Sequence, residues 1–131
     1  MQQLGAADCG AACLAMVLAL HGRQVPLEEL RQATGSGRGG VTARAILQAA
    51  ARYGLMGRGV RFEPEEIRFL PRGAILHWAF NHFVVFDGLG RKGIRIVDPA
   101  VGRRLIPYPR FREEFTGVGL ILEPGEQFVE G

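Results

Sequence analysis

The hydrophobic positions of the chain change their spacing near Gly54. Before that residue, apolar side chains recur every three or four positions, which is the period of a helix that buries one face. After it, short apolar runs rich in β-branched and aromatic residues are separated by turn residues, which is typical of strands. This order predicts an α+β fold, in which an N-terminal helical part packs on a C-terminal antiparallel β-sheet.

The first half of the chain predicts three helices with recognisable ends. Asp8 is expected to cap the first helix, because its carboxylate can accept backbone N–H groups that have no helical partner. Thr42 is expected to cap the third helix in the same way, and Gly54 is expected to end it. The three expected helices cover residues 8–21, 27–33 and 43–53.

The second half predicts six strands joined by short connections, which favour antiparallel neighbours. The expected strands cover residues 55–62, 73–78, 82–87, 93–97, 103–106 and 117–122, with short helical segments at 64–69 and 109–115. Residues 1–124 are interpreted as one domain, and the polar segment 125–131 as a linker towards a following transmembrane domain.

Composition narrows the class of protein. With 131 residues, of which 47% are hydrophobic, the chain is long enough for a core without disulfides or a structural metal. The net charge is only +3, and the arginines are scattered along the sequence, so no nucleic-acid surface is predicted. No apolar run is long enough to cross a bilayer, and no signal peptide precedes the two cysteines. A cytoplasmic domain with reduced thiols is therefore expected.

The strongest candidate for chemistry is Cys9, which follows Asp8 in the first turn of the first helix. The partial positive charge at the start of a helix favours a thiolate. A nucleophilic thiol needs a base and a group that orients the base, and His82 and Asp98 can supply these roles. His77 is a competing base, and a zinc site formed by these histidines with Cys9 and Asp98 is disfavoured because no paired cysteine motif accompanies it.

These residues and their order resemble a known family, the bacteriocin-processing cysteine peptidases. These are papain-like domains that cut leader peptides after a double-glycine site, and most form the N-terminal domain of a peptide-exporting ABC transporter. The resemblance extends from Gln3 to about Pro124. The matching motifs are Gln3, Asp8-Cys9-Gly10, Ala12-Cys13-Leu14, His82-Phe83-Val84-Val85 and Asp98-Pro99.

The resemblance implies a role for each catalytic residue. Cys9 is expected to attack the carbonyl after the second small residue, with His82 as the base and Asp98 as its orienting group. The Gln3 amide and the backbone N–H of Cys9 are expected to bind the oxyanion. Cys13, one turn after Cys9, is expected to be a small buried core residue.

The resemblance also implies partners and a substrate surface. The expected partners are an amphipathic leader helix ending in Gly-Gly or Gly-Ala, and the transmembrane and nucleotide-binding domains of the exporter. No cofactor or metal is expected, since ATP would be used only by a separate transporter domain. Within the full-length transporter, the domain is expected at the cytoplasmic face of the bacterial plasma membrane. The isolated domain is expected to be a monomer. The residues expected to contact the leader are Ala12, Met16, Ala43 and Leu47, and those expected to line the glycine subsites are Trp78 and Asn81.

Two other classes of function stay open at this point. A leader-binding module without catalysis is one, although the presence of Cys9 argues against it. An acyltransferase or transglutaminase-type enzyme is the other, because the same cysteine, histidine and aspartate logic serves that chemistry on related folds.

Overall fold

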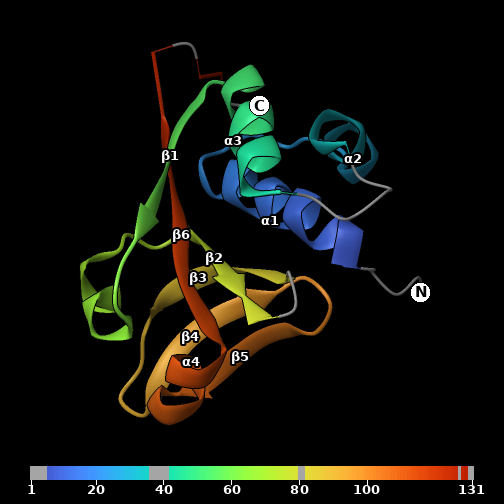
Figure 1. Cartoon of the computed structure of the whole chain (residues 1–131). Coiled ribbons are helices and arrows are strands. Elements are labelled where there is room, and N and C mark those ends of the chain that lie inside the picture. Colours follow the sequence, from blue (N-terminus) through green and yellow to red (C-terminus); the bar gives the residue numbers. More distant parts are fainter. Residues whose placement is uncertain (1–5, 36–41, 80–81, 127, 130–131) are drawn as a thin grey trace.

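A computed structural model of the chain describes residues 6–35, 42–79, 82–126 and 128–129. Figure 1 shows a group of three helices beside a long twisted sheet, with a short helix on the other side of the sheet. The helices are α1 (Ala6–Leu20), α2 (Leu27–Thr34), α3 (Ala43–Arg52) and α4 (Tyr108–Glu114), and η1 (Pro64–Phe69) is a 3₁₀ helix. The strands are β1 (Leu55–Arg61), β2 (Ile75–Trp78), β3 (His82–Leu89), β4 (Gly93–Asp98), β5 (Gly102–Pro107) and β6 (Phe115–Pro124).

The helix starts confirm one predicted cap and correct the other. Thr42 caps α3 as predicted, since its hydroxyl oxygen accepts the N–H of Ala45 at 3.0 Å. Asp8 does not cap α1, because the helix is already formed at Ala6 and Asp8 lies within its first turn. Its carboxylate instead pairs with Arg31 Nε at 2.9 Å. Asp8 therefore ties the start of α1 to α2.

The sheet has six strands in the order β1-β6-β2-β3-β4-β5, and every neighbouring pair is antiparallel. The strands from β2 to β5 are neighbours in chain order, as short connections predict. The last strand departs from this order, because β6 lies between β1 and β2 and pairs with β1 from Leu55↔Pro124 to Arg61↔Val118. The run Leu120–Leu122 of β6 is buried, as expected of a strand with neighbours on both sides.

Two hydrophobic clusters cover the two faces of the sheet. The first lies between the sheet and helices α1 to α3, and the second lies on the opposite face around Phe111 of α4. The alternation along β3 separates them: Val85 belongs to the first cluster and Val84 to the second. The predicted arrangement of helices on an antiparallel sheet is confirmed.

The C-terminal residues that the structure describes lie against the helical part. The ring of Phe128 contacts His21 at 6.2 Å between centroids and packs on the first cluster. Arg23 donates to the carbonyl oxygen of Val129 at 3.3 Å. The interpretation of 125–131 as a linker stays a prediction. Among the described residues, no helix combines the length and the apolar character needed to span a membrane.

At Gly93 the backbones of β4 and β5 lie too close together for a side chain. A methyl group at this position would collide with the carbonyl oxygen of Ile106 on β5. We expect Gly93→Ala to lower the free energy of unfolding by about 2 kcal/mol or more, because the backbone of two paired strands must separate. Urea unfolding would measure the loss. Gly59→Ala is the matched control, since its added methyl group meets only Leu120 Cδ2 at 3.8 Å, and equal losses in both variants would contradict the expectation.

Candidate active site

Cys9 lies in the first cluster, at the end of α1 that contacts the start of β3. The residue is 1% exposed. Its sulfur accepts the backbone N–H of Phe83 at 3.3 Å, across 74 positions of the sequence. This contact fixes the position of the sulfur relative to the start of β3. The site is therefore assembled where the helical part meets the sheet.

His82 is the first residue of β3 and bridges Cys9 and Asp98. Its Nε2 lies 2.9 Å from Asp98 Oδ1. It also shares a hydrogen bond with Cys9. An imidazole held on both sides by a nucleophile and a carboxylate is the arrangement of a general base with its orienting group.

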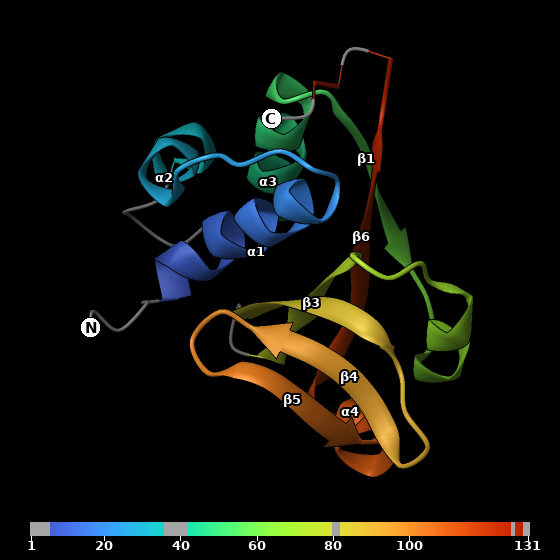
Figure 2. The same ribbon diagram turned by 180° about the vertical axis from the view of Figure 1, so that it is seen from behind.

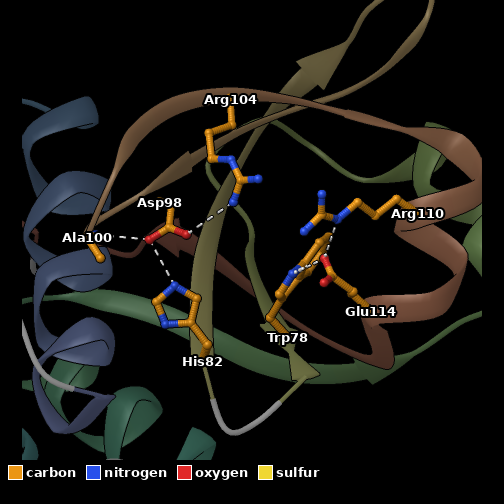
Figure 3. Close-up of polar contacts among 7 residues, drawn as sticks. All are labelled: Trp78, His82, Asp98, Ala100, Arg104, Arg110 and Glu114. Carbon is orange, nitrogen blue, oxygen red and sulfur yellow. Dashed lines mark hydrogen bonds and ion pairs between the residues drawn. The ribbon is translucent and has the colours of Figure 1, made fainter.

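Asp98 ends β4 and is 5% exposed. Its Oδ1 accepts the N–H of Ala100 at 2.9 Å as well as the contact with His82. Its Oδ2 lies 3.9 Å from Arg104 Nη1 on β5. Figure 3 shows the carboxylate between the histidine ring and the guanidinium group. These contacts fix the orientation of the carboxylate and compensate its charge in a buried position.

The electrostatics of the site favour a charged imidazole. The hydrogen bond with Cys9, and then the hydrogen bond with Asp98 and the charges of both residues, raise the pKa of His82 from 6.5 to about 9, against the opposing effect of burial. Below that pH the histidine is an imidazolium that can donate a proton to a leaving group.

Cys13 has none of this polar environment. It is completely buried in the first cluster. Burial, with smaller contributions from the charges of Cys9 and Asp98, raises the pKa of the Cys13 thiol well above its ordinary value. The prediction that Cys13 is a core residue is confirmed.

The structure also bears on the two alternatives to His82 as a base: His77 as the base, and a zinc site. His77 Nδ1 lies 2.9 Å from the hydroxyl of Thr116, and the ring contacts Phe83 at 5.0 Å between centroids. His82, and not His77, is the histidine next to Asp98. Within the described ranges, no group of three or more histidine, cysteine or acidic side chains has the geometry to hold a metal ion.

The residues predicted to bind substrate differ in how much of their surface is exposed. Ala12 is 7% exposed and belongs to the core, while Met16 and Ala43 are half-buried against the first cluster. Trp78 is 6% exposed in the second cluster, and its N–H donates to Glu114 at 3.0 Å, as Figure 3 shows. The predicted contact of Trp78 with substrate glycines stays a prediction. Gln3 and Asn81 lie outside the described residues.

Leu47 is the predicted leader contact that lines an open groove. The groove has a volume of about 650 Å³ and lies between α3, β1 and the segment after β6. Its lining residues are Leu47, Ala51, Gly54, Leu55, Met56, Gly57, Gly125 and Glu126.

Sequence reasoning missed three groups that contact the candidate triad of Cys9, His82 and Asp98. The Phe83 N–H and the Arg104 side chain reach the site only through the packing of α1 and the register of the sheet, which no local motif encodes. The Ala100 N–H was within reach, because an aspartate commonly accepts the N–H two residues later in a turn.

Comparison with known proteins identifies the family of the chain. The family model of the peptidase C39 family matches residues 1–127. The chain belongs to the peptidase C39 family. Figure 3 shows the imidazole of His82 and the carboxylate of Asp98 in this C39 domain, with α1 beside them.

Two curated relatives of this C39 domain are much longer proteins. The chain is 37% identical over 128 residues to the colicin V secretion/processing ATP-binding protein CvaB of Escherichia coli, covering 98% of this chain and 18% of that protein. It is 31% identical over 139 residues to the transport/processing ATP-binding protein ComA of Streptococcus pneumoniae strain R6, covering 96% of this chain and 19% of that protein. The C39 domain thus spans less than a fifth of these relatives.

Solved structures share the fold of the C39 domain. A double glycine motif protease from an AMS/PCAT transporter, in complex with a leader peptide, matches with a TM-score of 0.86 and 45% identity, covering 95% of this chain and 89% of that chain. The peptidase domain of Streptococcus ComA, a bi-functional ABC transporter, matches with a TM-score of 0.85 and 26% identity, covering 95% of this chain and 96% of that chain. The predicted papain-like α+β class is confirmed.

Proposed function

We propose that this C39 domain is a cysteine endopeptidase that removes leader peptides by cutting after a double-glycine site. The observation that carries the proposal is the contact series from the Phe83 N–H through Cys9 and His82 to Asp98. A related structure, 45% identical to this chain, is a double glycine motif protease bound to a leader peptide. Both support the same chemistry from independent directions.

The reaction follows from the positions of these groups. Cys9 passes its thiol proton to His82, Cys9 Sγ attacks the carbonyl carbon of the second glycine, and the carbonyl oxygen becomes an oxyanion. The C–N bond then breaks, His82 gives its proton to the leaving amine, and a thioester remains on Cys9. Water, deprotonated by His82, hydrolyses the thioester and releases the leader. Asp98 keeps the imidazole oriented in both steps.

The oxyanion would be held by two donors. The backbone N–H of Cys9 is one, and the Gln3 amide is the proposed second. In comparable sites one such donor contributes roughly 3–4 kcal/mol to transition-state stabilisation. Narrow subsites would account for glycine at the cut, because a larger side chain would collide with their walls.

The apolar groove beside α3 is the proposed docking site of the leader helix. Leu47 and Met56 line it, and Met56 is 70% exposed. Gly57 keeps the floor open, since a Cβ there would lie 2.6 Å from Leu47 Cδ2 and 2.5 Å from Leu122 Cδ2. An amphipathic helix binds such a groove through apolar side chains at helical spacing. The groove would therefore select the precursor, while the narrow subsites select the glycines.

Leu47→Asp tests the groove. We expect leader affinity to fall about tenfold or more, because a carboxylate would lose hydration against an apolar leader side chain. Fluorescence anisotropy of a labelled leader would measure this loss. Gln48→Asp, which adds the same charge on the exposed side of α3, is the matched control. Equal affinity of both variants and the wild type would place the leader elsewhere.

The names and lengths of CvaB and ComA suggest the larger protein in which this domain acts. CvaB and ComA are described as secretion or transport proteins that bind ATP. We propose that the domain serves such an exporter, beside its transmembrane and nucleotide-binding domains and on the cytoplasmic side of the membrane. The hydrolysis itself would need neither metal nor cofactor, and the isolated domain would be a monomer.

The deciding experiment is mass spectrometry of a synthetic leader incubated with the domain. The probe ends in Gly-Gly followed by several residues, and a matched probe carries Val-Val at the same place. Cleavage after Gly-Gly, absent with Val-Val, is the expected result. Binding without cleavage would support a docking module instead, and transfer of the acyl group to an added amine in preference to water would support an acyltransferase.

A further inference from the structure

Exposed arginines gather on one face of the sheet at its β5 end. Arg95 of β4 and Arg103 of β5 line the same depression, and Arg72 pairs with Asp87, which lines it too. We call this the basic sheet face. Its basic residues are Arg72, Arg95 and Arg103, and the exposed Arg91 and Lys92 lie in the turn that precedes β4.

Strand register places Arg95 and Arg103 on the same face of the sheet. Arg95 of β4 lies opposite Leu105 of β5, and Arg103 lies opposite Val97 two positions along. These side chains therefore share one face, because partners in a sheet project to the same side. Ile94, Ile96 and Ile106 project to the other face, into the second cluster. Although the arginines are scattered in the sequence, the fold gathers them.

The basic sheet face is open and its charge is poorly compensated. Arg95 and Arg103 are both exposed. Asp87 pairs with Arg72 at 2.8 Å, so it offers little neutralisation to Arg95. Figure 2 shows β4 and β5 in front, with α4 behind them and no helix over this side of their lower ends. A depression of about 420 Å³ on these strands is lined by Asp87, Arg95, Ile96, Arg103, Arg104 and Leu105.

The adjoining edge of the sheet is open too. β5 is the last strand in the sheet order, and among the described residues it pairs only with β4. An edge strand presents backbone N–H and C=O groups that another strand can pair with. Along β5, exposed Arg103 and Leu105 alternate with half-buried Arg104 and buried Ile106. This alternation suits a partner strand with acidic side chains at alternate positions.

We propose that β5 and the basic sheet face dock an extended acidic segment of the exporter chain outside this domain, added as a seventh strand. This rests on the proposed function, which places the domain within a longer exporter. The relatives CvaB and ComA contain more than four fifths of their length outside the matched region. Polar, charged surfaces of this kind are typical of contacts between domains of one chain.

Two other occupants fit less well. The exposed apolar residues Leu89 and Val101 lie at opposite ends of β4, and exposed Leu105 lies opposite Arg95 and two positions from Arg103. Charged side chains therefore interrupt the continuous apolar surface that entry into a lipid bilayer needs. The leader groove lies against β1, at the other end of the sheet order. A bound leader helix therefore leaves β5 accessible.

Lys92, the only lysine of the chain, makes the proposal testable in the full-length exporter. A carbodiimide joins lysine amines directly to neighbouring carboxylates. We expect mass spectrometry to find Lys92 joined to an acidic segment outside residues 1–131. The double variant Arg95→Glu/Arg103→Glu is expected to lower the yield about tenfold, since like charges repel the segment. Arg58→Glu/Arg61→Glu on β1 is the matched control and should leave the yield unchanged.

Three outcomes would overturn the proposal. They are links from Lys92 only to carboxylates of this domain, a yield unaffected by charge reversal at Arg95 and Arg103, and β5 amides that exchange hydrogen equally fast in the exporter and the isolated domain. The last result would also mean that the arginines only protect the edge from aggregation. Leader cleavage by the isolated double variant should remain at the wild-type rate, so failure here is distinguishable from failure of the proposed peptidase.

Discussion

Cys9→Ala is expected to abolish cleavage of a double-glycine leader and to preserve leader binding. The variant lacks the sulfur that forms the thioester, and loss of a nucleophile in a triad costs on the order of 10⁵- to 10⁶-fold in rate. Leader binding should persist, because the proposed groove beside α3 contains none of the triad residues. Product formation by mass spectrometry and leader affinity by fluorescence anisotropy would measure the two effects separately.

Cys13→Ala is the matched control for that experiment. It removes a thiol from the same helix, one turn away and completely buried. Because Cys13 is a core group, the expected result is unchanged cleavage chemistry with some loss of stability. A normal rate in Cys9→Ala, or an inactive but folded Cys13→Ala, would reverse the assignment of the nucleophile.

Asp98→Asn is expected to lower the cleavage rate about 10²- to 10⁴-fold and to shift its pH dependence. The negative charge of Asp98 is one of the effects that raise the pKa of His82 to about 9. Without it the pKa falls towards 6.5. Because the imidazolium donates the proton to the leaving amine, the alkaline decline in rate should move from near pH 9 to lower pH.

The measurement is the rate of leader cleavage across pH 6–10 for the wild type and the variant, a range that spans the free and raised pKa of His82. Glu114→Gln is the control, since Glu114 is another carboxylate of the same region that contacts Trp78 and Arg110 instead of the histidine. A decline that stays near pH 9 in Asp98→Asn would show that Asp98 does not set the protonation of His82.

Local sequence patterns predicted the elements of the fold but not the order of the strands. The Thr42 cap, the glycine after α3 and the alternation along β3 are encoded within a few residues, and the elements end close to the predicted positions. The position of β6 between β1 and β2 depends on contacts between distant segments. The helix start was misjudged for a different reason, because Asp8 has the chemistry of a cap but is used to pair with Arg31.

The sequence was enough to predict which residue types form the candidate site, but not the contacts that orient them. A cysteine in the first turn of a helix, together with His82 and Asp98, indicated the reaction, and the family resemblance supplied the pairing. The supporting contacts from Phe83 and Arg104 depend on how α1 meets the sheet and on strand register. The basic sheet face was missed for the same reason, since residues scattered from Arg72 to Arg103 become neighbours only in the folded sheet.

The division of the active site between the helical part and the sheet has a consequence for protein synthesis. The ribosome makes Cys9 first, and Phe83, whose N–H contacts the sulfur, follows 74 positions later. At typical elongation rates this interval lasts about 4 to 15 seconds. During that time the nascent chain contains a nucleophile without its base. On the proposed function, the unfinished polypeptide cannot hydrolyse peptide bonds, and activity would begin only after β3 has docked on α1 and β4 has paired with β3.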